Sequence, residues 1–228
     1  MRTRAKVAIG TGAAVVALGV GAAVLGPGLY AGWAERRVDD APTLDAASAA
    51  PLDAAALSGT WSVADGSFAG YRVDEVLSGE DITVTGRTEE VDGSVTLDGG
   101  TITAAEVVVD MASVATDELP RDEYFRTRAL QTDTYPTATF TLTEPAEVPA
   151  GATAVALVGD LTVHGVTQQV TVDAEVAAAA KAGADGVQVV GSVPVTFADF
   201  GVEAPSLGFV TVEEQGAVEF SLLLAPQA

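Results

Sequence analysis

The sequence predicts an all-β domain, built as an antiparallel sandwich or barrel, behind an apolar N-terminal segment. From Gly59 onward, short runs of alternating apolar and polar residues, rich in Val and Thr, recur between Gly, Asp and Pro. This period of two is typical of half-buried strands. Many short strands without intervening helical patterns favour antiparallel architectures over parallel sheets.

The composition allows one domain with a hydrophobic core plus an appendage. The chain has 228 residues, of which 48% are hydrophobic and none is cysteine. A length of this order suits one domain. The lack of cysteine excludes disulfides, thiolate metal sites, a cysteine nucleophile and an acylated N-terminal cysteine.

The charge is strongly acidic and unevenly distributed. Five basic and five acidic residues cancel within residues 1–58, which leaves six basic and 27 acidic residues, and the whole net charge of −21, in the remainder. Nucleic-acid binding depends on Lys and Arg that neutralise phosphates, so this domain is not expected to bind nucleic acid. We interpret the charge as a solubility device, with an acidic binding face as the alternative.

The N-terminal region predicts a membrane anchor followed by a linker. Residues 7–34 carry no charge and follow the basic start MRTRAK. A run of this length is long enough to span a bilayer, and the basic start places the N-terminus in the cytoplasm. Cleavage after Ala34 is the alternative. The Ala-, Pro- and Asp-rich residues 35–58 predict a tether, so the domains are 1–34, 35–58 and the exported residues 59–228.

Two local signals stand out within the β-rich domain. Asp98-Gly-Gly lies between two alternating runs and predicts a hairpin. The stretch 116–136 breaks the strand pattern and predicts a short helix, because Pro120 suits a first helical turn and Phe125 and Ala129 have the spacing of one helical face. The same stretch holds three of the six basic residues of the domain, namely Arg121, Arg126 and Arg128.

The single histidine, His164, is interpreted as a strand-end or turn residue. In the run DLTVHGV it alternates with Leu161 and Val163, and Gly165 follows it. A hydrolase triad needs a positioned nucleophile, and the motif G-x-S-x-G is absent. A zinc site needs several His or Cys ligands. Adjacent acidic residues such as Glu89 and Glu90 point to opposite faces of a strand, so they do not indicate a glycosidase pair.

Counting by twos places one set of apolar side chains on inward faces. An eight-stranded barrel is just wide enough either to be filled by its own side chains or to hold one small ligand. The prevalence of Val over Phe and Trp favours a cavity. The predicted inward residues are Tyr71, Val73, Val107, Val109, Phe140, Leu142, Leu161, Val163, Val193, Val195, Phe220 and Leu222.

Several segments, taken in order, resemble the YceI-like family of bacterial lipid- and polyisoprenoid-binding domains. They are WSV at Trp61, YRVDEVL, VVVDMASVATDELPRDEYFRTRAL, YPTATFTL, GDLTVHGVTQQV and VTFADFGV. The resemblance covers about residues 59–226 and is nearest to actinobacterial members with an N-terminal anchor. It implies an eight-stranded antiparallel, lipocalin-like barrel with a helix near its mouth and no catalytic residues.

The resemblance also implies a ligand, namely a long isoprenoid such as a polyprenyl phosphate or a quinone tail in an apolar tunnel. The family's segments match Arg121-Asp122, Phe125, Tyr135-Pro136, the Leu161–Val166 turn and Phe200-Gly201. Phe125 and Phe200 therefore join the inward residues as expected ligand contacts. Arg121, Arg126 and Arg128 are expected either to meet a head group or to form salt bridges with acidic neighbours. Many members carry a histidine in the strand that corresponds to Tyr71–Leu77, where this chain has Val and Glu.

The sequence thus leaves three hypotheses. The first is a single-pass, membrane-tethered barrel that holds an isoprenoid lipid outside the cytoplasm, with no metal and no cofactor besides that lipid. The second is a filled barrel that presents its acidic surface to another protein of the cell envelope. The third, an enzyme, is the least supported.

Overall fold

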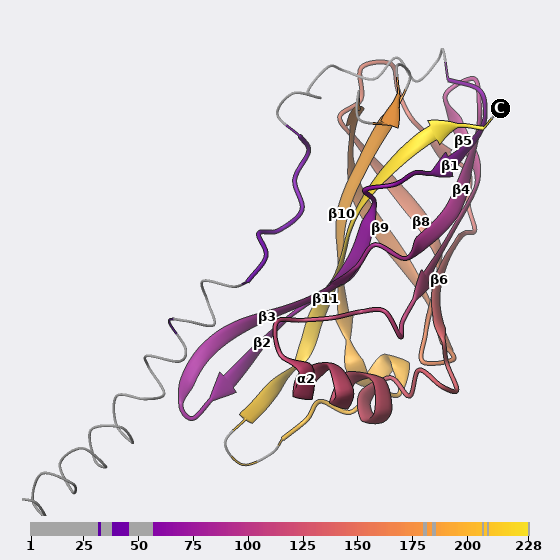
Figure 1. Ribbon diagram of the computed structural model, residues 1–228. Coiled ribbons are helices and arrows are strands. Elements are labelled where there is room, and N and C mark those ends of the chain that lie inside the picture. The colour runs from indigo at the N-terminus through magenta and orange to yellow at the C-terminus, as the bar shows by residue number, and fades with distance from the viewer. Residues whose placement is uncertain are drawn as a thin grey trace, which may run out of the picture.

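A computed structural model describes residues 32, 38–45, 57–179, 182–183, 186–206, 208 and 210–227. Within this part of the chain the strands close into a barrel (Figure 1). The strands are β1 (Gly59–Val63), β2 (Phe68–Leu77), β3 (Glu80–Thr88), β4 (Val91–Asp98), β5 (Thr101–Asp110), β6 (Thr137–Leu142), β7 (Ala146–Glu147), β8 (Ala154–Val163), β9 (Val166–Ala178), β10 (Val187–Thr196) and β11 (Val210–Pro226).

The barrel wall has eight antiparallel positions, three of which are built from two strands each. β1 and β2 share one position beside β11; β4 pairs with β1 and β3 pairs with β2, so β3 and β4 share the next position. β6 and β7 both pair with β5 and share the third. The remaining positions are β5, β8, β9, β10 and β11, and the ring closes through the β1–β11 pairing. The predicted all-β antiparallel barrel is therefore confirmed. The predicted membrane span, residues 7–34, lies outside the described residues except for Gly32.

The break between β1 and β2 is held by one buried serine. The hydroxyl of Ser67 donates to the carbonyl of Ala64 at 2.7 Å and accepts the amide of Leu223 at 2.9 Å. The side chain thereby replaces the ladder hydrogen bonds that the kinked backbone loses, as buried backbone groups require. The kink lets β2 and β3 continue beyond the barrel wall as a projecting hairpin (Figure 1).

Three short helical segments lie at the barrel end near this hairpin. They are α2 (Leu119–Tyr124), the π-helical turn η4 (Phe125–Ala129) that continues it, and the 3-10 turn η6 (Phe197–Phe200). Pro120 lies in the first turn of α2, so the predicted short helix is confirmed. We call this end of the barrel the mouth, and Figure 1 shows α2 lying below it.

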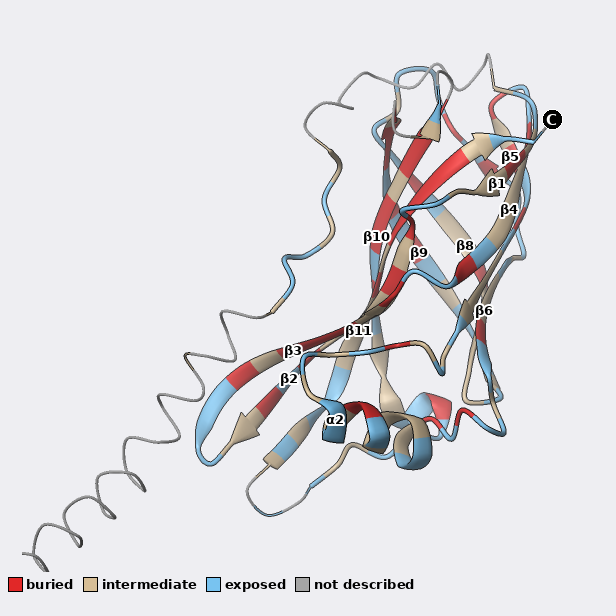
Figure 2. Cartoon of the chain, viewed as in Figure 1, coloured by how far each residue is buried: buried red, intermediate tan, exposed pale blue. Residues whose placement is uncertain are grey.

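We call the end of the barrel opposite the mouth the base. Trp61, Leu97, Ile102 and Leu224 lie there and belong to the main hydrophobic cluster of the barrel. Figure 2 shows buried positions along the upper wall and more exposed ones near α2.

Aromatic rings inside the wall lie over glycines of neighbouring strands. Gly191 pairs with Phe220 across β10 and β11, and a Cβ at Gly191 would come within 2.5 Å of the Phe220 ring. Tyr71 covers its strand partner Gly86 in the same way, with a corresponding distance of 2.4 Å. Because glycine has no side chain, the rings can lie against the wall instead of projecting into the barrel.

Residues 38–45, which we call the strap, lie against the outer wall. The amide of Asp39 donates to Thr85 Oγ1 at 3.1 Å, and Arg72 donates to the carbonyl of Asp39 at 2.8 Å. Arg72 also pairs at 2.6 Å with Glu219, which is buried. Part of the predicted tether is therefore bound to the barrel. The hydrogen bonds that hold it cannot be predicted from the hydrophobic pattern of the sequence.

The direction of the strap follows from its two ends. Its far end is held where the amide of Asp45 donates to Gln188 Oε1 at 2.9 Å. Gln188 pairs with Leu223 of β11, whereas Arg72 pairs with Ala217 of the same strand, which is nearer the mouth. The N-terminal end of the strap is therefore the end nearer the mouth.

None of the helices within the described residues is long and apolar enough to cross a bilayer.

Replacing Thr85 by Val should loosen the strap without disturbing the barrel. The change removes the hydroxyl that accepts the Asp39 amide, so amide hydrogen exchange at Asp39 should accelerate by about tenfold, the value of one such hydrogen bond. Thr83→Val, on the same face of β3, is the matched control because Thr83 bonds Asp74 instead. Equal exchange at Asp39 in both variants would show that the strap is not held at Thr85.

A methyl group at Gly191 should force the Phe220 ring off the wall. We expect Gly191→Ala to lower the free energy of unfolding by about 1–3 kcal/mol, the usual cost of overpacking. In denaturant titrations, Phe220→Leu in the Gly191→Ala background should cost less than it does alone, because it relieves the clash. Strict additivity of the two changes would contradict the proposed ring position.

Candidate functional site

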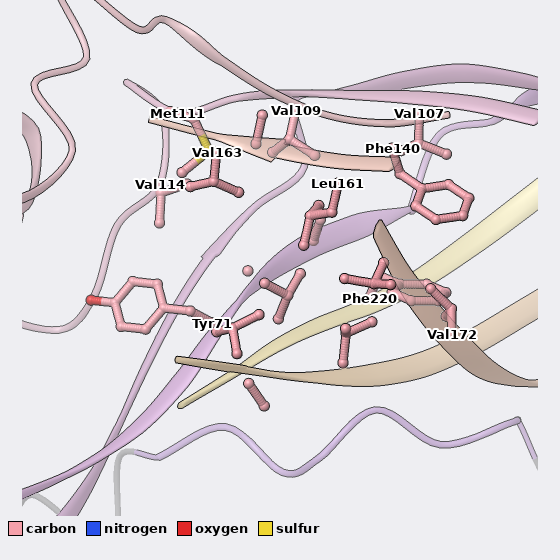
Figure 3. Close-up of a pocket in the computed structure, with 18 of the residues that line it drawn as sticks. Tyr71, Val107, Val109, Met111, Val114, Phe140, Leu161, Val163, Val172 and Phe220 are labelled. Carbon is pink, nitrogen blue, oxygen red and sulfur yellow. The ribbon is translucent and has the colours of Figure 1, made fainter. Parts of the chain in front are cut away.

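The barrel encloses an elongated apolar cavity of about 600 Å³ (Figure 3). Side chains from all eight wall positions line it, and nearly all of them are aliphatic or aromatic. Eight residues of β11 separate the partners of Tyr71 near the mouth and Trp61 at the base, which is roughly 26 Å along the strand. A cavity of this volume is within the range of ligand sites, and its length suits an extended chain.

The structure brings thirteen of the fourteen residues that were predicted to face inward or to contact the ligand to this cavity. They are Tyr71, Val73, Val107, Val109, Phe125, Phe140, Leu161, Val163, Val193, Val195, Phe200, Phe220 and Leu222. Leu142 lies two residues after Phe140 on the same face of β6 and packs against the main hydrophobic cluster, but it does not line the cavity. The Phe140 ring lies over Gly159, which is the strand partner of Leu142.

The same alternation also accounts for residues of the cavity lining that were not predicted. The β9 residues Val170, Val172 and Val176 line the cavity and follow the same alternation. Glu75 lines it too, two residues after Val73 on the inward face of β2. The spacing alone could have identified Glu75, but its charge makes an outward position the ordinary expectation.

The mouth is framed by a ring stack and an ion pair. The rings of Tyr71 and Phe125 stack with centroids 5.3 Å apart and an interplanar angle of 9°. Arg121 Nη2 lies 3.3 Å from a carboxylate oxygen of Glu75, and Arg121 Nη1 lies 3.1 Å from Asp117. The helical segment α2–η4 therefore attaches to β2 through one aromatic and one ionic contact, both at the cavity entrance.

The three predicted head-group arginines separate in the structure. Arg121 lines the cavity, whereas Arg126 and Arg128 do not. Arg126 lies 3.7 Å from Glu123, and both side chains are substantially exposed. Salt bridging to acidic neighbours, the alternative raised from the sequence, is thus present for Arg121 and Arg126.

Tyr71 presents a neutral phenol at the mouth. Burial raises the pKa of the Tyr71 hydroxyl well above its ordinary value, and the neighbouring carboxylates of Asp122 and Glu75 add to that rise against the opposing effect of Arg121. In Figure 3 its ring extends from the wall at the edge of the cavity. Tyr71 therefore adds no negative charge to the entrance at neutral pH.

His164 lies in the tight turn between β8 and β9, as predicted. His164 and Gly165 both have positive φ, 52° and 73°, as a two-residue hairpin turn requires. The His164 ring packs edge-on against Tyr135 at 4.6 Å, and its Nδ1–H donates to the carbonyl of Phe200 at 3.3 Å. His164 does not line the cavity, so its contacts are those of a structural turn residue.

The fold has counterparts among solved structures. A polyisoprenoid-binding domain from Saccharophagus degradans matches with a TM-score of 0.58 and 20% identity, over 75% of this chain and 100% of that one. Burkholderia cenocepacia BcnA matches with a TM-score of 0.53 and 23% identity, over 67% of this chain and 95% of that one. At these identities the likeness establishes the fold alone. No curated protein matches the sequence.

The family assignment rests on the sequence of the barrel. The model of the YceI-like domain matches residues 61–224, which span the wall from β1 to β11. This match covers more than half of the chain and coincides with the closed barrel and its apolar cavity. The chain belongs to the YceI-like family.

Proposed function

We propose that this protein binds a long isoprenoid lipid in the apolar cavity of its barrel. The main support for this proposal is the cavity itself, about 600 Å³ of apolar space that reaches from the mouth to Trp61. Removing a hydrocarbon chain from water gains about 2.5 kcal/mol for each 100 Å² of surface buried. That gain grows with every prenyl unit, so a long tail can offset the cost of ordering the ligand.

Two further observations support an isoprenoid ligand. The chain belongs to the YceI-like family, and a protein with the same fold from Saccharophagus degradans is described as a polyisoprenoid-binding domain. The hollow interior also argues against the filled-barrel alternative. Binding is favoured over catalysis because the one histidine lies in a turn and the cavity lining is almost entirely hydrocarbon.

We further propose that the barrel is exported and tethered to the cell membrane by the apolar residues 7–34, with the N-terminus in the cytoplasm. The strap supports a particular orientation, because its N-terminal end lies nearer the mouth than its C-terminal end. A tether that reaches the barrel from that side would set the mouth toward the bilayer. A lipid could then enter the cavity from the membrane without crossing water.

Filling the cavity with a large side chain should abolish lipid binding while the barrel still folds. In the full chain, Val109→Trp places an indole in the cavity, whereas Val108→Trp places one on the outer face of the same strand. Native mass spectrometry of protein purified from producing cells should show an isoprenoid bound to the wild type and to Val108→Trp. The same lipid should be missing from Val109→Trp.

Circular dichroism should first confirm that both tryptophan variants retain the β-rich fold. Lipid retained by a folded Val109→Trp protein would place the ligand outside the barrel. An empty wild-type protein that also fails to take up added polyprenols would contradict the proposed function.

A further inference from the structure

The charged side chains at the cavity entrance are predominantly acidic. Of the residues that the structure describes, four charged ones line the cavity, namely Glu75, Glu118, Glu203 and Arg121, so acids outnumber bases among them by three to one. Glu75 forms an ion pair with Arg121 and is the more buried of the two, since its side chain is 6% exposed and that of Arg121 is 23% exposed. The charges that line the entrance therefore sum to a net negative charge, although Arg121 is the more exposed member of its ion pair with Glu75.

The guanidinium of Arg121 is already engaged on two sides. Nη2 lies 3.3 Å from Glu75 on β2, and Nη1 lies 3.1 Å from Asp117 in the segment before α2. Asp122 does not compete for it, since its carboxylate accepts the amide and hydroxyl of Thr116 at 2.8 and 2.7 Å. The two carboxylates therefore fix Arg121 in place across the entrance.

A phosphate that took the place of Glu75 on the Arg121 guanidinium would displace a carboxylate whose side chain is only 6% exposed. That exchange would leave the Glu75 carboxylate buried and unpaired, which is far more costly than breaking an exposed ion pair. An uncharged head group leaves the pair intact. The geometry therefore penalises anionic head groups specifically, whatever the hydrocarbon tail contributes.

Among the described residues, no other cation lining the cavity compensates for this penalty. Arg126 and Arg128 lie outside the lining. Arg72 and Arg87 lie toward Glu219 and the strap on the outer wall. An incoming phosphate would find no second basic residue at the cavity wall.

We propose that Glu75 is a specificity-determining residue that makes the mouth accept isoprenoids with uncharged heads, such as alcohols or carbonyl compounds, and reject those with phosphate heads. The inference rests on the proposed function and narrows its ligand class. Arg121 acts as the ion-pair partner that holds Glu75 in place. Of the two alternatives raised from the sequence for these arginines, this follows the salt bridge and not the contact with a head group.

The test compares two lipids that differ only in the head. The full chain is reconstituted in phosphatidylcholine nanodiscs that contain equal amounts of a polyprenol and its phosphate ester of the same length. Native mass spectrometry of the released protein then gives the ratio of the two bound lipids. The amount of each lipid bound to Val109→Trp, in which the cavity is filled, measures lipid that adheres outside the barrel. This amount is subtracted from the amount bound to each other protein.

We expect the wild type to favour the polyprenol by at least about tenfold, the discrimination typical of one buried charge conflict. Glu75→Gln retains the side-chain shape and frees Arg121, so the ratio should fall toward one. Glu147→Gln, an exposed change of equal charge at the far end of the barrel, should leave the ratio unchanged.

Three results would overturn the assignment of Glu75. They are equal binding of both lipids by the wild type, an unchanged ratio in a folded Glu75→Gln protein, and an equal shift in Glu147→Gln. The wild-type ratio needs no variant, so the proposal stays testable if Glu75→Gln does not fold. Lipid binding that does not exceed the Val109→Trp background would instead refute the proposed function together with this inference.

Discussion

The structure depends on keeping the inside of a β-barrel empty. Hydrophobic side chains ordinarily fill the middle of an eight-stranded barrel, because close packing stabilises any interior. Here several large inward rings lie over glycines of neighbouring strands, as Phe220 does over Gly191 and Tyr71 over Gly86. Val is the commonest residue of the cavity lining, and its side chain is too short to meet another across the lumen.

An empty apolar cavity has a cost in stability, which the fold offsets at its edges. Lining atoms without partners lose dispersion contacts. At the base, Trp61 belongs to the main hydrophobic cluster, and the buried Ser67 bridges the kink between β1 and β2 through its hydrogen bonds. The strap adds hydrogen bonds to the outer wall where the buried Glu219 meets Arg72. These contacts hold the wall from outside and from one end, so the interior is left for a ligand.

The mouth carries the polar chemistry that the interior lacks. The ion pair of Arg121 with Glu75 and the stack of Phe125 on Tyr71 both attach the helical segment to β2. The same contacts that position α2 therefore decide which head groups fit the entrance. Structural and recognition roles coincide at these four residues, so a change at Glu75 should be judged by folding and by ligand choice separately.

The alternation of apolar residues predicted the barrel lining well, because each strand has one face toward the cavity and the period of two is strict. Alternation alone could not show that Leu142 packs against the core without reaching the cavity. Glu75 was not predicted, because its charge argued against an inward position. The strap could not be predicted, since its contacts join backbone amides and carbonyls to Thr85, Arg72 and Gln188. The kink at Ser67 likewise depends on one tertiary hydrogen-bond pair.

The most direct measurement is a crystal structure of the protein with the lipid that co-purifies with it. The account predicts continuous density for an extended chain from the Tyr71 entrance to Trp61, with the Phe220 ring flat against Gly191. A lumen closed by the Phe140 and Phe220 rings, with no room for a chain between them, would contradict it.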